Sequence, residues 1–190
     1  MAASHFSSQE SLLSRRYKGS RQNELNVFEL EKLLYTGKSV WQHADEVWPN
    51  LYLGDQEIAA NKGELMQMNI THILNASHSH FRGGEENYKG MNICYLGIEA
   101  QDSPTFDMSI HFYPAADFIN KAITGRGKIL VHCAVGVSRS ATLVLAFLMI
   151  HHKMTLVEAI TAVKERRGII PNRGFLRQLL NLDKSLHKMY

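Results

Sequence analysis

The chain has 190 residues and a mass of 21.6 kDa, which suits one globular domain and is short for two. Hydrophobic residues make up 45% and charged residues 21%, a composition that excludes a wholly disordered chain. The formal net charge of +3 is too small for a dedicated nucleic-acid-binding protein. Two cysteines cannot form a disulfide framework, so we expect a reducing compartment.

Residues 1–25 are expected to form a flexible, solvated tail rather than a transit peptide or a nuclear signal. The segment is rich in serine and carries a basic cluster, Arg15, Arg16, Lys18 and Arg21. The longest apolar stretch, residues 141–150, has half the length that a bilayer span needs. We therefore expect no membrane partner and a location in the cytoplasm, the nucleus or both.

Regular structure is expected to begin with a helix after Asn26. Asn26 and Glu29 match a capping box, and Gly37 is placed to end the helix. Residues 46–54 are expected to be extended, with a bend at Pro49.

Strands and helices alternate through the middle of the chain. Residues 71–76 and 93–97 have the composition of short strands, and a polar loop separates them. Helical patterns cover residues 55–68, where Asp55 is the expected cap, and residues 108–123.

From residue 128 onward, one buried strand leads into helices. The pattern predicts a strand over residues 128–132 and a helix over 139–151. A second capping box opens a helix over 155–166, and Asn172 is the expected cap of the last helix. This order predicts one α/β domain over residues 26–187, a twisted central sheet flanked by helices.

The segment from His132 to Ser140 lies between the last strand and its helix, where backbone N–H groups and the helix dipole form an anion site. Cys133 starts this loop, and six positions on Arg139 can grip a tetrahedral oxyanion. That field favours a thiolate at Cys133, a nucleophile aimed at phosphorus. Gly136 permits the tight turn, and Ser140 can donate a hydrogen bond to the sulfur. A lone cysteine at a strand end is usually a core residue, but the combined spacing favours the nucleophile.

A phosphate ester also needs a proton on its departing oxygen. The loop over residues 99–104 holds our candidate for this acid, Asp102. Asp107 is the second candidate, since it lies where it could cap the following helix. Spacing along the chain does not by itself decide between Asp102 and Asp107.

Residues 131–140 resemble the HCx5R[ST] signature of the cysteine-dependent protein tyrosine phosphatase superfamily. Resemblance to its dual-specificity branch is found in residues 48–54, 70–76, 140–146 and 171–176. From about Asn26 to Leu186 the chain is similar to the small atypical, vaccinia-H1-related dual-specificity phosphatases.

The resemblance implies the fold of that superfamily and hydrolysis of phosphotyrosine and phosphoserine or phosphothreonine in proteins, without a metal or other cofactor. It implies a cysteinyl-phosphate intermediate on Cys133, phosphate binding by Arg139 and general acid catalysis by Asp102. Ser140 would assist the second step, and Asn172 would support the phosphate loop. Mitogen-activated protein kinases are possible substrates at the level of the family.

The phosphate-binding residues would be Ala134, Val135, Gly136, Val137 and Ser138 together with Arg139. The five residues before Arg139 carry no lysine or arginine, which in this family favours a protein substrate over inositol phosphates. Val135 and Val137 depart from the polar residues that are common elsewhere in the branch.

Other reactive residues have simpler interpretations. His132 is expected to hydrogen-bond the loop and tune the thiolate. His78 and His80 are expected to be solvated, since no cysteine or carboxylate partner lies at ligand spacing, and we expect no metal. Cys94 is expected in the core, with a protective disulfide to Cys133 as the alternative.

Basic residues are frequent in the C-terminal half, namely Lys164, Arg166, Arg167, Arg173 and Arg177. A solvated face is the expected role, and a secondary site for an acidic or phosphorylated loop is the alternative.

The alternative to an enzyme is a phosphatase-fold protein that binds phosphoproteins without turning them over. The helix after Asn26 is a candidate for homodimer contacts, and no nucleic-acid partner is expected.

Overall fold

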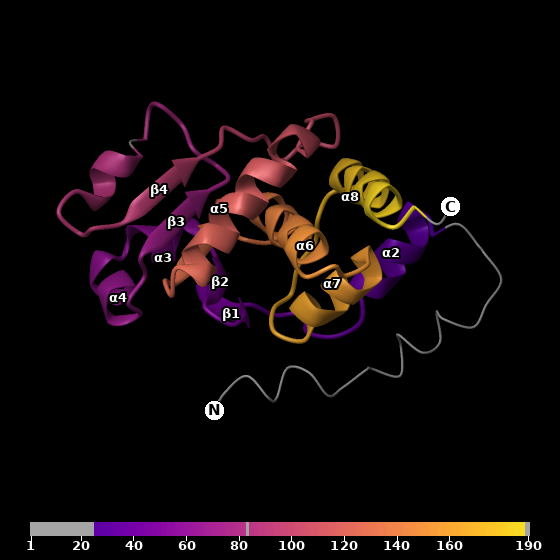
Figure 1. Cartoon of the computed structure of the whole chain (residues 1–190), viewed down its shortest axis with the longest axis horizontal. Helices are drawn as coiled ribbons and strands as arrows, with labels where there is room; N and C mark the ends of the chain where they lie inside the picture. The colour runs from indigo at the N-terminus through magenta and orange to yellow at the C-terminus, as the bar shows by residue number, and fades with distance from the viewer. Residues whose placement is uncertain (1–24, 83, 189–190) are drawn as a thin grey trace.

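A five-stranded sheet forms the centre of the computed structural model, which describes residues 25–82 and 84–188 (Figure 1). The strand order is β1-β2-β5-β3-β4, with β1 antiparallel to β2 and the other pairs parallel. The strands are β1 (Ala44–Trp48), β2 (Leu51–Gly54), β3 (His72–Asn75), β4 (Cys94–Gly97) and β5 (Ile129–His132). The predicted class, a central sheet flanked by helices, is confirmed.

Helices cover both faces of the sheet. One face is covered by the short helices α3 (Gln56–Ala60) and α4 (Lys62–Gln67). The other belongs to the larger core, to which the remaining helices contribute: α2 (Val27–Leu34), α5 (Phe112–Thr124), α6 (Arg139–His151), α7 (Leu156–Lys164) and α8 (Arg173–Leu186).

The central strand β5 contributes side chains to the hydrophobic cores on both faces of the sheet, because its side chains alternate between the two faces. Leu130 packs with the α3 and α4 side, whereas Ile129 and Val131 join the larger core. Helix α6, which follows β5, is buried from Ser140 to Ile150, so it is apolar around its whole circumference. The loop between β5 and α6 is therefore held at both ends by buried elements.

Three helix starts follow the predicted capping pattern. Asn26 and Glu29 form a reciprocal capping box on α2, and Thr155 and Glu158 form another on α7. The side chain of Asn172 accepts from a backbone N–H in the first turn of α8. These local predictions are confirmed.

Two predicted helices are wrong in extent. Residues 55–68 form two helices because Asn61 leaves the helical region (φ −88°, ψ 82°) and its side chain caps α4. The segment expected to be helical from residue 108 starts with a 3₁₀ turn, Ser109–His111, and α5 begins at Phe112. Residues 1–24 of the expected tail lie outside the described residues.

The prediction of Cys94 as a core residue is also wrong. Cys94 is exposed because β4 is an edge strand of the sheet. In the strand register Cys94 is level with His72 and Ile129, four positions before Cys133, or about 13 Å along the strands. A disulfide bridges Cα atoms only about 4.4–6.8 Å apart, so this geometry does not allow one between Cys94 and Cys133.

Within the two described segments, no helix combines the length and the hydropathy that crossing a membrane requires.

Candidate active site

Cys133 lies at the base of the loop between β5 and α6. Its side chain is buried, with 3% of the residue exposed. The N–H of Gly136 donates to Sγ of Cys133 at 3.2 Å, and Oγ of Ser140 lies 3.1 Å from the same sulfur. Two donor groups therefore converge on the sulfur, where they stabilise negative charge.

Gly136 has a backbone conformation that the loop needs. Its φ is +80°, and a Cβ at this position would lie 2.2 Å from the carbonyl oxygen of Gly54. Only glycine fits this close approach without strain. The turn directs the Gly136 N–H inward to the sulfur and its carbonyl outward.

Arg167 holds the outer side of this loop. Its guanidinium is wholly buried and donates from Nε to the Gly136 carbonyl at 2.9 Å and from Nη2 to the Val135 carbonyl at 3.2 Å. Nη1 forms an ion pair with Asp45 at 2.7 Å. The cation thus links two carbonyls of the loop between β5 and α6 to β1.

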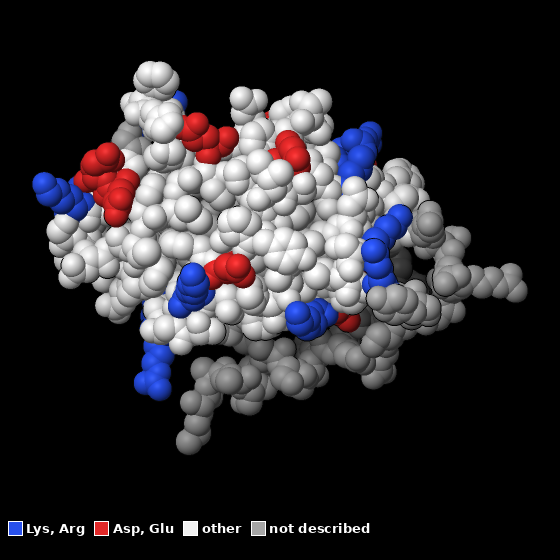
Figure 2. All heavy atoms as spheres, turned by 45° about the horizontal axis from the view of Figure 1, so that its top comes forward, with Lys and Arg blue, Asp and Glu red and all other residues white. Residues whose placement is uncertain are grey.

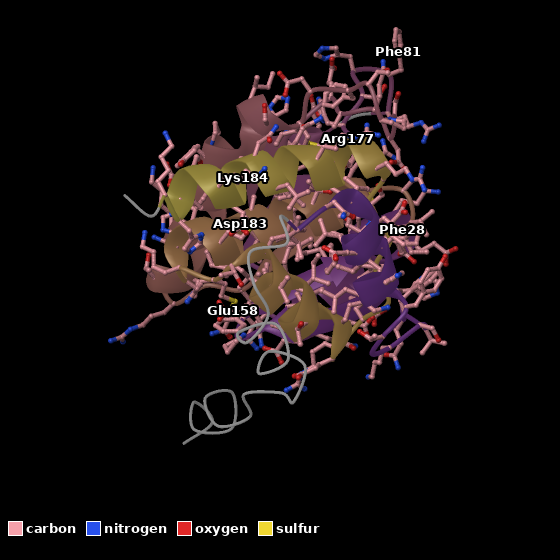
Figure 3. The ribbon with its side chains drawn as sticks, turned by 90° about the vertical axis from the view of Figure 1, so that its right-hand side faces the viewer. Phe28, Phe81, Glu158, Arg177, Asp183 and Lys184 are labelled. Atoms are coloured by element: carbon pink, nitrogen blue, oxygen red, sulfur yellow. The ribbon has the colours of Figure 1, made fainter. Side chains whose placement is uncertain are left out.

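The prediction of one solvated basic face is therefore wrong at two positions. Arg167 is buried, and Lys164 is 4% exposed with its ammonium group on the Lys38 carbonyl. Arg177 and Lys184 lie on the outer side of α8 (Figure 3). On the face in Figure 2 the basic side chains of the described residues stand apart, separated by uncharged surface.

Arg139 starts α6 and turns its guanidinium toward the loop that follows β4. Nη1 donates to the Ala100 carbonyl at 3.0 Å. Its Nε is buried and has no hydrogen-bond partner among the described residues. A buried donor without a partner is unfavourable unless a ligand supplies an acceptor.

Asp102 lies against the loop between β5 and α6. Its Oδ1 accepts hydrogen bonds from Oγ of Ser138 at 2.8 Å and from Nδ2 of Asn172 at 3.0 Å. Asn172 also donates its backbone N–H to Ser138 Oγ at 3.1 Å. The alternative acid, Asp107, accepts from the backbone and hydroxyl of Ser109 instead. The structure thus brings Asp102, and not Asp107, into contact with the loop of Cys133.

Gln178 of α8 anchors the end of the loop that carries Asp102. Its Oε1 accepts hydrogen bonds from the backbone N–H groups of Met108 at 2.7 Å and Ser109 at 3.0 Å. Its Nε2 donates to the carbonyl oxygen of Phe106 at 2.8 Å. Sequence reasoning missed the roles of Gln178 and Arg167, since each reaches the site through contacts with residues that are distant along the chain.

His132 is a buried neutral residue behind the loop. Burial lowers the pKa of its imidazole to about 4. Nδ1 lies 3.3 Å from the carbonyl oxygen of Cys133, and Nε2 is buried without a hydrogen-bond partner in the part of the chain that the structure describes. The histidine therefore contacts the backbone of the loop, as its position suggested, and carries no charge near neutral pH.

The remaining loop residues differ in exposure. Val135 is 49% exposed, while Ala134 and Val137 are partly buried. The Ala134 carbonyl accepts from the Gln56 N–H, which ties the loop to α3. Val135 is thus accessible at the surface of the loop, where it could contact the part of a substrate that surrounds its phosphate group.

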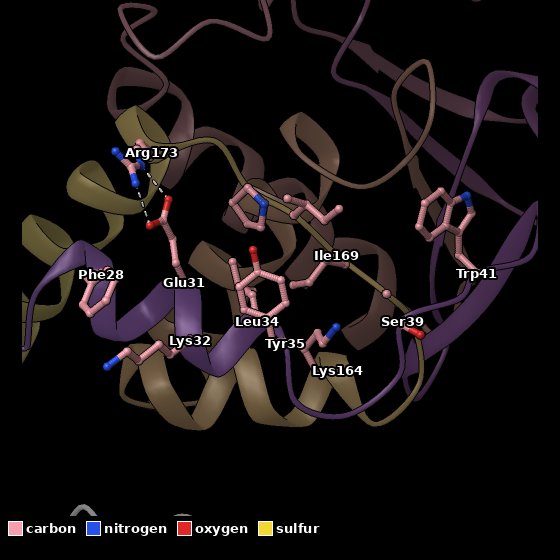
Figure 4. Close-up of a pocket in the computed structure, with 13 residues that line it drawn as sticks. Phe28, Glu31, Lys32, Leu34, Tyr35, Ser39, Trp41, Lys164, Ile169 and Arg173 are labelled. Atoms are coloured by element: carbon pink, nitrogen blue, oxygen red, sulfur yellow. Dashed lines mark hydrogen bonds and ion pairs between the residues drawn. The ribbon is translucent and has the colours of Figure 1, made fainter.

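A groove of about 560 Å³ lies beside α2 rather than at Cys133 (Figure 4). Glu31 and Arg173 form an ion pair at its edge, at 2.6 Å. Phe28 on α2 and Tyr35, the C-cap residue of this helix, contribute exposed aromatic rings, at 60% and 90% exposure. The loop of Cys133 is not part of this groove.

The chain matches the family model described as "Dual specificity phosphatase, catalytic domain" over residues 51–185. Dual specificity protein phosphatase 26 of Bos taurus and of Homo sapiens are each 69% identical to it over 165 residues, which is 86% of this chain and 78% of theirs. In the sequence, residues 26–31 and 168–171 resemble this phosphatase, and the match confirms that resemblance.

Solved structures agree with this relationship. Human DUSP28 superposes with a TM-score of 0.69 and 29% identity, over 78% of this chain and 98% of that one. A mouse putative dual specificity phosphatase complexed with zinc tungstate gives a TM-score of 0.70 and 28% identity, over 80% of this chain and 94% of that one. A human tyrosine phosphatase-like serine/threonine/tyrosine-interacting protein gives a TM-score of 0.65 and 30% identity, over 75% of this chain and 96% of that one.

Proposed function

The chain belongs to the dual-specificity phosphatase family and is a protein phosphatase, and on this premise we propose which residues perform the reaction. Cys133 is the nucleophile. Its thiolate forms a bond to phosphorus as the bond to the tyrosine, threonine or serine oxygen breaks. Asp102 gives its proton to that oxygen, and Arg139 with the amides of residues 134–138 binds the phosphate oxygens.

In the second step a water molecule attacks phosphorus and the sulfur–phosphorus bond breaks. Asp102, now ionised, takes the proton of the water, and the hydroxyl of Ser140 stabilises the departing thiolate. The observation that carries this assignment is the convergence of the Gly136 N–H and Ser140 Oγ on Sγ of Cys133. The unpartnered Nε of Arg139 supports it, since a phosphate oxygen would supply the acceptor.

The test is phosphate release from matched phosphotyrosine and phosphothreonine peptides by the wild type and by Cys133→Ser. Release by the wild type alone supports the cysteine mechanism, and the ratio of the two rates measures dual specificity. Turnover by Cys133→Ser would contradict the assignment. Binding of phosphopeptide without turnover by either protein would favour the alternative function, that of an interaction protein.

Mitogen-activated protein kinases are the protein substrates that we propose. The support is the uncharged loop with its exposed Val135, which suits a peptide around the phosphate better than a polyphosphorylated small molecule. A doubly phosphorylated kinase should lose its phosphates faster than its isolated activation-loop peptide. Equal rates would contradict recognition of the kinase itself.

The exposed face of α2 is the homodimer contact that we propose. Phe28 and Tyr35 expose aromatic surface there, which a second copy of the chain could cover. Light scattering after size exclusion should report a dimer for the wild type and a monomer for Tyr35→Glu. A monomeric wild type would contradict the proposal.

We further propose that residues 26–187 form the catalytic domain and that the protein acts in the cytoplasm or the nucleus. Two free cysteines, one of them exposed, support a reducing compartment. Limited proteolysis should leave a core that begins near Asn26, and fluorescence microscopy of the tagged chain should locate it. A core that begins within the strands, or a secreted chain, would contradict these two statements.

A further inference from the structure

Two loops at the same end of the sheet bring two histidines and a glutamate together. β3 and β4 are parallel neighbours with Asn75 opposite Gly97, so the loops that follow them leave the sheet side by side (Figure 1). His78 and His80 lie on the first loop, and Glu99 lies on the second. One ligand atom from each residue falls within a group no wider than 4.8 Å.

The sequence hides this cluster because Glu99 lies 19 positions after His80. The expectation that no carboxylate accompanies the two histidines is therefore wrong. Nε2 of His80 lies 2.8 Å from Oε1 of Glu99, although both side chains are largely exposed, at 80% and 52%. Phe81, next to His80, projects at the outer edge of the molecule (Figure 3). By itself, an exposed ion pair of this kind contributes little.

The imidazole of His78 is held in a fixed orientation. Its Nδ1 lies 2.8 Å from the hydroxyl of Tyr95, which also accepts a hydrogen bond from Nδ2 of Asn75 at 3.1 Å. The tyrosine oxygen has a second lone pair for a proton on Nδ1 of His78. That tautomer leaves Nε2 unprotonated and free to ligate, as in metal sites where a partner fixes the histidine ring.

Two glycines make room for the same ring. A Cβ on Gly97 would lie 2.5 Å from Cγ of His78, and a Cβ on Gly84 would lie 2.6 Å from its Cε1. The ring therefore sits in a slot that any larger residue at these positions would fill. His78 is thus a positioned side chain and not a freely solvated loop histidine.

We propose that His78, His80 and Glu99 bind a zinc ion. Two imidazoles and one carboxylate are a donor set that zinc accepts, with a fourth position left for water. Zinc bonds of about 2.0–2.2 Å bring ligand atoms to about 3.5 Å from one another. Rotation of the exposed His80 and Glu99 side chains can open their 2.8 Å contact to that spacing and place both atoms at the same distance from His78, which stays in its slot.

Another histidine with two carboxylates shows why convergence matters. His43 pairs with Asp55 through Nδ1 at 2.6 Å and with Glu57 through Nε2 at 3.3 Å. These contacts use opposite edges of one ring, so the two carboxylates do not meet at a common point. His43 is therefore a matched control for an exposed histidine that has acidic neighbours but no shared site.

The place of the zinc ion bears on catalysis. Glu99 precedes Ala100, whose carbonyl accepts from Arg139, and lies three residues before Asp102. A zinc ion at Glu99 would link the loop of the two histidines to the loop of the proposed acid. An ion bound there would restrain that loop.

The experiment is calorimetric titration of zinc chloride into the untagged full-length chain carrying Cys94→Ser and Cys133→Ser, so that no thiol competes. We expect one equivalent to bind. His80→Ala and Glu99→Gln on this background should each weaken binding at least about tenfold, and Tyr95→Phe should weaken it by about 10–100-fold through the orientation of His78. His43→Ala should bind zinc as the background does.

Three outcomes would overturn the site. These are no zinc binding by the background, binding by His80→Ala and Glu99→Gln as tight as that of the background, or an equal loss in His43→Ala. Circular dichroism melts without zinc establish that each variant is folded. Because both cysteines are absent, the result does not depend on the phosphatase mechanism.

Discussion

Arg167 donates from Nε to the carbonyl oxygen of Gly136 at 2.9 Å, while the N–H of Gly136 faces the sulfur of Cys133 at 3.2 Å. The buried cation and the sulfur therefore contact the same residue from opposite sides. The same guanidinium donates to the Val135 carbonyl at 3.2 Å, which belongs to the same peptide unit as the Gly136 N–H, so we expect its displacement to change the direction of that N–H.

Arg167→Met should impair both stability and phosphate binding. It leaves two loop carbonyls and Asp45 without their partner, and breaking a buried ion pair costs about 3 kcal/mol of unfolding free energy. Misplacement of the loop should lower kcat/KM by up to about 100-fold. Urea unfolding measures the first effect and peptide turnover the second.

Measuring oxyanion affinity distinguishes a positioning role of Arg167 from a purely structural one. Arg167→Lys keeps the charge but loses the fork of donors, so its affinity for tungstate, measured with Cys133→Ser, should fall even where the protein is fully folded. Arg177→Met, on the exposed side of α8, is the matched control. Unchanged tungstate affinity in Arg167→Lys would contradict the positioning role.

Asp102→Asn should lower kcat on phosphotyrosine and phosphothreonine peptides by about 100-fold or more, because a carboxamide is not acidic enough to protonate the leaving oxygen. The loss should shrink with an aryl phosphate whose leaving group is stable without protonation. Asp107→Asn should keep most of the activity, since Asp107 contacts Ser109 and not the phosphate loop. A larger loss in Asp107→Asn would reverse the assignment of the acid.

Gln178→Leu should loosen the loop that carries Asp102. Three hydrogen bonds disappear, and two backbone N–H groups lose their acceptor, which costs about 2 kcal/mol of unfolding free energy. We expect kcat to fall about tenfold through misplacement of the acid, with little change in KM. Gln178→Glu keeps both acceptor contacts and should recover most of kcat; failure to do so would contradict this explanation.

His132 should make the protein less stable as the pH falls. The folded pKa of about 4 lies below the ordinary value of 6.5, so the unfolded chain binds the proton first. The free energy of unfolding therefore decreases by roughly 2 kcal/mol as the pH falls from 7 to 5. His132→Asn should show a shallower pH slope in urea unfolding. An unchanged slope would show that His132 is not the titrating group.

Local features could be predicted from the sequence because their causes lie within a few residues. The capping boxes at Asn26 and Thr155 depend on a side chain and a backbone group three positions apart. The strand that ends at His132 depends on a short apolar run, and the loop from Cys133 to Arg139 depends on spacing along one turn. For the same reason the fold class and the loop of the nucleophile were predictable.

Only the tertiary structure decided which distant residues meet this loop. Arg167, Gln178 and Glu99 are ordinary polar residues along the chain, and no periodicity marks them. The packing of α7 against β1 buries the first, the packing of α8 against α6 and the 3₁₀ turn before α5 places the second on the acid loop, and the parallel register of β3 and β4 brings the third to His80. Cys94 became exposed for a similar reason, because strand order decides which strand is an edge. Contacts of this kind depend on the closure of long loops and on the burial of whole faces.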